Sequence, residues 1–237
     1  MDTTAIQHTL YEEIESTHIR LVKLRKADHA GLIECHLSTM RLDSAPRYVA
    51  LSYVWGDAQK KTSIRLNGNP FDVTENLPQA LLDLLGLGDM TDKLYIWIDA
   101  ICINQANDVE RSQQVPRMTQ IFGSAYRVIG SLRIPSESPS DDDVNLLFRL
   151  ANLVTVDIRH QTPLGDDIGW DKLQLQALDP CFAPFLSGLS CIFSDILSLP
   201  WFNRIWVRQE IVLAPQLPAI VIGKNQITTI TQTQKNA

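Results

Sequence analysis

The strongest constraint on the fold is the stretch Leu94–Gln105, LYIWIDAICINQ. Its first six residues form an almost unbroken apolar run, rich in isoleucine and aromatic residues, which ends in the carboxylate of Asp99. Such a run is typical of a strand buried on both faces, as in a parallel sheet covered by helices. Ligands of open α/β sheets bind beyond the carboxyl ends of the strands. We therefore predict a central strand over Leu94–Asp99, with Asp99, Asn104 and Gln105 at a candidate site. The alternative is a core strand followed by a hydrogen-bonded loop.

Two other segments have the composition of core strands. They are Tyr48–Val54 and Arg127–Leu132, and we expect both to flank Leu94–Asp99 in parallel. Apolar alternation indicates a pair of peripheral strands at His18–Leu24 and Leu32–Leu37. The predicted fold is therefore α/β, with a mostly parallel central sheet flanked by helices and extended by peripheral β-strands.

Turn and capping patterns mark the first hairpin and the first helix. Asn67-Gly68 predicts a tight hairpin turn between two short strands. Asn76, followed three residues later by Gln79, predicts a capping box at the start of a helix that ends at Gly86.

A second helix is predicted after the Leu94–Asp99 strand. Asn107 and Glu110 repeat the capping-box spacing at its start. Pro116 removes one backbone hydrogen bond inside it, so we expect a kink near the proline or a helix that restarts there.

Composition excludes several classes of protein. The net charge of −6, from 21 Lys+Arg against 27 Asp+Glu, speaks against a nucleic-acid-binding surface. Apolar stretches are too short for a membrane span, and the first residues lack the pattern of a signal peptide. The four cysteines lie far apart, which indicates reduced thiols and no metal site. We expect a cytoplasmic protein.

The chain divides into one large unit with two flanks. Residues 1–17 are a polar lead-in, 18–223 form the main domain, and 224–237 have the composition of a disordered tail. A Pro/Ser/Asp-rich loop begins near Arg133, and we expect a mainly helical insertion over about 133–198.

Three blocks together resemble the heterokaryon-incompatibility (HET) domain of filamentous fungi. They are Tyr48–Asp57 (YVALSYVWGD), Ile96–Gln105 (IWIDAICINQ) and Trp201–Ala214 (WFNRIWVRQEIVLA), in the order typical of that family. The resemblance implies an allorecognition effector that triggers cell death, with self-association and an incompatibility partner protein. One departure is the third predicted strand, VIGSL, where the family usually has a more apolar run that contains tryptophan.

The HET family in turn resembles the TIR (Toll/interleukin receptor) fold, so the implied sheet is TIR-like. NAD-cleaving TIR domains carry a catalytic glutamate four residues after a tryptophan on a helix, which matches Trp206 and Glu210 here. The resemblance implies that Glu210 is the catalytic carboxylate, that NAD or a related nucleotide is the substrate, and that no cofactor is needed. The alternative is a surface glutamate that pairs with Arg204 or Arg208, a contact worth under about 1 kcal/mol.

The turn after Tyr48–Val54 supplies the remaining candidate binding residues. Gly56 permits close backbone approach, and Trp55 offers a ring for stacking. Arg204 is a candidate phosphate ligand or a salt-bridge partner of a site carboxylate. The alternative is a packed turn around a core tryptophan. The candidate residues of this turn are Ser52, Tyr53, Trp55, Gly56 and Asp57.

Three functions stay open at this point. The first is a cell-death effector that cleaves NAD, and the second is a non-catalytic TIR-like module that assembles with partners. The third, a hydrolase with Cys102 as nucleophile, lacks a histidine within any of the three blocks, and a buried structural cysteine is favoured. The first two differ in whether Glu210 faces the Ser52–Asp57 turn or bulk solvent.

Overall fold

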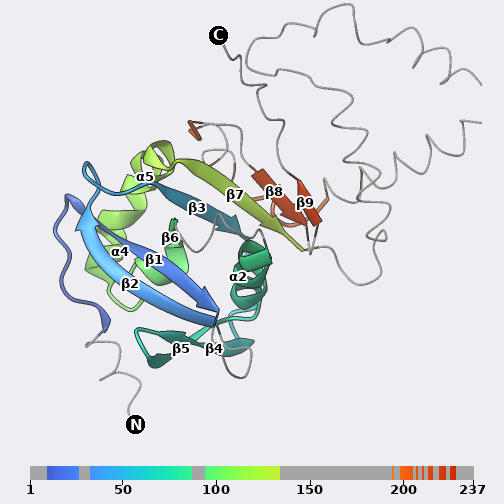
Figure 1. Ribbon diagram of the computed structural model, residues 1–237, viewed down its shortest axis with the longest axis horizontal. Helices are drawn as coiled ribbons and strands as arrows, with labels where there is room; N and C mark the ends of the chain where they lie inside the picture. The colour runs from blue at the N-terminus through green and yellow to red at the C-terminus, as the bar shows by residue number, and fades with distance from the viewer. Residues whose placement is uncertain are drawn as a thin grey trace, which may run out of the picture.

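The computed structural model describes residues 10–26, 33–86, 94–133, 194, 198–204, 207, 210, 213–215, 219–222 and 225–227. Within these residues the strands form one nine-stranded sheet in the order β5-β4-β2-β1-β6-β3-β7-β8-β9 (Figure 1). The strands are β1 His18–Lys26, β2 Ile33–Arg41, β3 Tyr48–Tyr53, β4 Lys61–Leu66, β5 Asn69–Thr74, β6 Tyr95–Trp97, β7 Arg127–Leu132, β8 Ala219–Ile222 and β9 Asn225–Ile227.

The middle of the sheet is parallel, and its margins contain antiparallel pairs. β6, β3, β7 and β8 run parallel to one another, whereas β1 pairs antiparallel with both β2 and β6. β6 is joined to β7 by a run of helical segments, the usual kind of connection between strands that run in the same direction. The mixed α/β class is confirmed, while the likeness to the TIR fold stays a prediction. The predicted insertion over about 133–198 lies largely outside the described residues.

The predicted strand Leu94–Asp99 is buried inside the sheet but is shorter than expected. β6 covers Tyr95–Trp97, and Ile96 faces Val22 of β1 on one side and Val49 of β3 on the other. The expected neighbours are therefore wrong in part, because β3 lies next to β6 and β7 lies beyond β3. The ladder stops at Trp97 because Ile98 is already the N-cap of the following helix.

The described helices connect the strands of the sheet. Val115–Arg117 forms a single 3₁₀ turn around Pro116, which confirms the predicted interruption. None of the described helices is long and apolar enough to cross a membrane. The helices are α2 Asn76–Gly86, α3 Asp99–Cys102, α4 Asp108–Gln114, η2 Val115–Arg117 and α5 Met118–Ser124.

The hairpin prediction is confirmed, and the first capping box is wrong. Asn67 and Gly68 both have positive φ, as a tight hairpin turn between β4 and β5 requires. Asn76 begins α2, but its side-chain amide donates to the carbonyl of Val54 (3.0 Å) and accepts from Arg133 (2.9 Å). Gln79 donates to Asp83 within the helix instead of reaching back.

The second capping box is half correct. Asn107 caps α4 by accepting from the backbone amides of Val109 and Glu110. The Glu110 carboxylate does not return to Asn107, because it binds the Arg20 guanidinium (2.5 and 3.1 Å) and the backbone amide of Asn104 (2.8 Å). Arg20 is 1% exposed and Glu110 5%, so this is a buried ion pair between β1 and α4.

Candidate functional site

The carboxyl end of β3 holds the centre of the candidate site. All six residues of β3 are buried, and the strand lies inside the sheet between β6 and β7. The hydroxyl of Ser52 accepts a hydrogen bond from the Trp201 indole N–H (2.8 Å) and donates one to the Glu210 carboxylate. The chain thus brings together residues 158 positions apart, from two of the three blocks that the sequence singled out.

Glu210 is buried, and the surface-glutamate alternative is therefore wrong. The residue is helical, is 3% exposed and contacts Ser52 instead of bulk solvent. Burial raises the pKa of its carboxyl above the usual value, although the Ser52 hydrogen bond and the charge of Arg204 oppose the rise. Trp206 and Arg208 lie outside the described residues, so the expected stacking of Trp206 on Glu210 stays a prediction.

A glycine in β7 makes room for the indole that holds Ser52. Gly130 pairs with Ser52 in the β3–β7 register, and a Cβ atom added to it would lie 2.7 Å from Cζ2 of Trp201. Trp201 is 1% exposed and packs edge-to-face against Phe202. The glycine of VIGSL thus has a packing reason. Sequence reasoning missed both Gly130 and Trp201, although an isolated glycine inside a strand is a signal of close approach.

Asp99 forms a second acidic centre, and its charge acts on the first, Glu210. It is the first residue of α3, and its carboxylate accepts from the Trp55 indole N–H (3.0 Å) and from the amide of Ala100 (2.7 Å). Loss of solvent around this carboxylate raises its pKa, against the opposing influence of Arg204 and Trp55. Trp55 is partly buried and packs against the hydrophobic core, so the hydrogen bond to Asp99 holds a ring that also serves the fold.

Arg204 is a cation whose charge acts on both acidic centres. Its guanidinium donates to the backbone carbonyl of Tyr53, the residue after Ser52. Its positive charge lowers the pKa of both Asp99 and Glu210. The described contacts contain no direct ion pair of Arg204, so of the two predicted roles the salt bridge is not formed, and phosphate binding stays a prediction.

Two residues of the predicted turn serve the fold. Gly56 has a φ of +84°, and a Cβ atom there would meet the Asn76 amide nitrogen at 2.7 Å, so the close approach is to α2. Asp57 is exposed and accepts from the amide of Gln59 (2.9 Å), which closes a local turn. No described contact joins either residue to Ser52 or Glu210.

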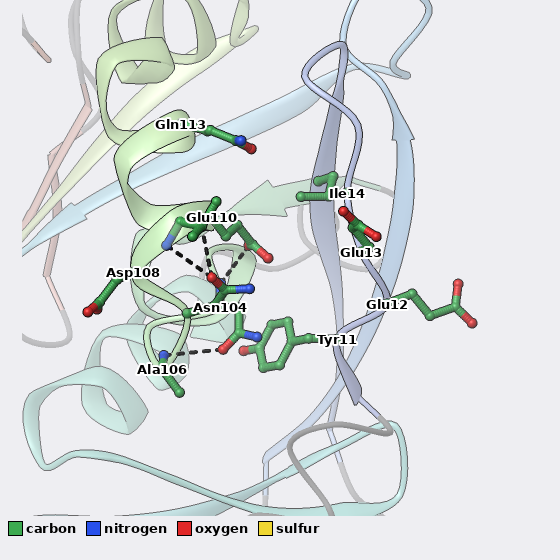
Figure 2. A pocket seen from close by; sticks show the side chains of 11 residues that line it. Tyr11, Glu12, Glu13, Ile14, Asn104, Ala106, Asp108, Glu110 and Gln113 are labelled. Atoms are coloured by element: carbon green, nitrogen blue, oxygen red, sulfur yellow. Dashed lines mark hydrogen bonds between the residues drawn. The ribbon is translucent and has the colours of Figure 1, made fainter.

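Asn104 and Gln105 are adjacent in the chain, but they serve different parts of the structure. Gln105 donates to the backbone carbonyl of Asp99 (2.8 Å) and so supports the second acidic centre. Asn104 instead lines a groove of about 630 Å³ between α4 and the segment that precedes β1. Figure 2 shows Tyr11 and Ile14 on one wall of this groove and Glu110 and Gln113 on the other.

Cys102 has the environment of a structural thiol. It is 2% exposed, burial raises its pKa strongly, and its sulfur accepts from the amide of Ile98 (3.3 Å). A nucleophilic cysteine needs a thiol that is accessible and that ionises readily, and Cys102 meets neither condition. The expectation of a buried cysteine is confirmed.

Comparisons with known proteins agree with the three sequence blocks. Residues 48–210 match the family model described as heterokaryon incompatibility protein (HET). The chain is 30% identical over 225 residues to heterokaryon incompatibility protein 6, OR allele, of Neurospora crassa; the match covers 84% of this chain and 32% of that protein. The chain thus spans about a third of that relative's length. No solved structure matches it. The chain belongs to the heterokaryon incompatibility (HET) family.

Proposed function

We propose that this chain is an effector domain of fungal heterokaryon incompatibility, and that its cell-death activity depends on the carboxylate of Glu210, which lies against Ser52. Membership of the HET family and the name of the Neurospora relative support the biological setting. The observation that carries the site is the buried carboxylate of Glu210 on the hydroxyl of Ser52, at the carboxyl end of a parallel strand. Both residues fall within the 48–210 match.

The chemistry that suits this carboxylate is cleavage of NAD at the nicotinamide–ribose bond. The bond between ribose C1′ and the pyridinium nitrogen breaks with its electron pair on nitrogen, so nicotinamide leaves neutral. The oxygen of a water molecule then bonds to C1′ and releases a proton to solvent. A carboxylate close to C1′ stabilises the positive charge that develops on the ribose. Arg204 is the candidate ligand for the substrate phosphates.

The second candidate is an assembly module that recruits an incompatibility partner or a second copy of this chain without catalysis. The specific observation in its favour is the 3% exposure of Glu210, since a substrate has no direct access to a carboxylate covered in this way. In this case the Ser52–Glu210 contact would only stabilise the segment that carries Trp201 and Glu210.

The test is expression of the wild type and of Glu210→Gln in a fungal host, with cell survival and cellular NAD followed together. Glutamine keeps the shape and the hydrogen bond to Ser52 but removes the charge. We expect the variant to be harmless, with NAD cleavage reduced by a factor of roughly 100 or more. Glu75→Gln, at an exposed position, is the matched control. Full toxicity of Glu210→Gln with unchanged NAD would leave the assembly module as the function.

The purified chain should be assayed at low and at high concentration. A self-associating enzyme will release nicotinamide only at the higher concentration, whereas a non-catalytic module will release none at either. This second arm separates a need for self-association from an absence of catalysis.

A further inference from the structure

Two linked hydrogen bonds end at the carboxylate on which the proposed function depends. The Trp201 indole N–H occupies the acceptor side of the Ser52 hydroxyl (2.8 Å), so the hydroxyl proton is directed to Glu210. All three side chains are at most 3% exposed. At this exposure the Glu210 carboxylate is not accessible to the ribose of a substrate in the conformation described.

We propose that the two hydrogen bonds that link Trp201, Ser52 and Glu210 form a latch that keeps the site closed. Activity begins when these hydrogen bonds break and the latch opens. The inference rests on the proposed function, since it concerns the regulation of the same carboxylate. It explains how a buried glutamate and a substrate can belong to one site. It also gives the effector an inactive resting state.

The turn that carries Trp201 is held to β3 at two consecutive residues. Trp201 binds the side chain of Ser52, and three residues later Arg204 binds the backbone carbonyl of Tyr53. Gly130 lies against the indole and has no Cβ atom, so the ring packs on backbone at that position. The indole N–H bond is thus a specific restraint on the closed position, and its loss leaves the Arg204 bond as the remaining described tie.

The variant that tests the latch is Trp201→Phe, because phenylalanine keeps an aromatic ring and lacks the N–H donor. Loss of one hydrogen bond should raise the open population roughly fivefold. We expect Trp201→Phe to kill the fungal host at lower expression than the wild type does, and the double variant Trp201→Phe/Glu210→Gln to be harmless. A merely structural tryptophan would give the opposite result, a loss of toxicity.

Trp97→Phe is the matched control. Trp97 is also 1% exposed and packs against Phe122, with 5.4 Å between the ring centroids, and no described hydrogen bond joins it to Ser52 or Glu210. The control makes the same change in volume at another fully buried position. It should lower stability without raising toxicity.

A direct measurement on the purified chain completes the test. Carbodiimide coupling of an amine to carboxyl groups, read by mass spectrometry, should label Glu210 roughly fivefold faster in Trp201→Phe than in the wild type, with exposed Glu75 as the internal standard. If Trp201→Phe does not accumulate, Gly130→Ala takes its place, because its Cβ displaces the indole while Trp201 stays.

Unchanged labelling of Glu210 together with unchanged or reduced toxicity would overturn the latch. The proposed function fails in a different way, through full toxicity of Glu210→Gln. The labelling experiment still reports on the latch in that case, because it does not depend on catalysis.

Discussion

Two buried glutamates of this domain have opposite surroundings. Glu110 is 5% exposed and binds the Arg20 guanidinium through both oxygens, with the Asn104 amide as a third donor. Glu210 is 3% exposed and has the Ser52 hydroxyl as its described hydrogen-bond partner. Arg204, whose charge acts on Glu210, donates to a backbone carbonyl instead of to the carboxylate. A fully paired buried charge indicates a structural role, whereas an incompletely compensated one in a site indicates function.

The largest effect is expected at the fully paired glutamate. Glu110→Ala leaves the Arg20 charge buried without its partner, so the free energy of unfolding should fall by about 3–5 kcal/mol. Urea denaturation measures the loss. Asp108→Ala removes a pair with Arg111 in which the carboxylate is 85% exposed, and should cost under about 1 kcal/mol. Equal losses in the two variants would remove the basis of the comparison.

The next effect is expected at the glycine beside the Ser52–Glu210 contact. Gly130→Ala places a Cβ atom 2.7 Å from the Trp201 ring, a contact that forces the indole to move. Overpacking of this kind costs about 1–3 kcal/mol in unfolding free energy. Gly86→Ala, where an added Cβ meets no atom within 4 Å, is the matched control and should show no such loss. Tryptophan fluorescence should report the movement in Gly130→Ala alone.

The smallest effect concerns the pH dependence of stability at Glu210. Burial raises the folded-state pKa of this carboxyl above its ordinary value of 4.5, so the folded state binds the proton more tightly than the unfolded state. Its contribution to stability is therefore present at low pH and is lost as pH rises through the folded-state pKa. Glu210→Gln removes this dependence. The stability difference between the variant and the wild type should favour the variant at neutral pH and shrink on acidification; a difference that grows on acidification would contradict the raised pKa.

Local sequence patterns predicted which segments form strands and turns better than they predicted which strands pair with each other. The apolar run at Leu94–Asp99 identified a buried strand, and Asn67-Gly68 identified a hairpin, because both signals are complete within a few residues. The position of β1 against β6 was not predictable in this way, since antiparallel contact between Val22 and Ile96 joins segments far apart in the chain. The predicted parallel neighbours of β6 were therefore only half right.

The same limit applies to the site. Glu110 fits a capping box by spacing alone, yet its carboxylate binds Arg20, because a charged partner from another strand outcompetes a local amide. Ser52 and Glu210 were singled out through a family resemblance, and the structure brings them into contact. Trp201 and Gly130 were missed because each explains the other only in three dimensions.

The place of β1 in the sheet sets a practical limit on how this domain can be cut. The family-matched region begins at residue 48, after β1 and β2 have ended. A recombinant fragment that starts there would lack β1, so one edge of β6 would be unpaired. The buried carboxylate of Glu110 would also lose its partner, the Arg20 guanidinium. The unit that a laboratory should express is thus larger than the segment by which the family is identified, and must include His18–Arg41.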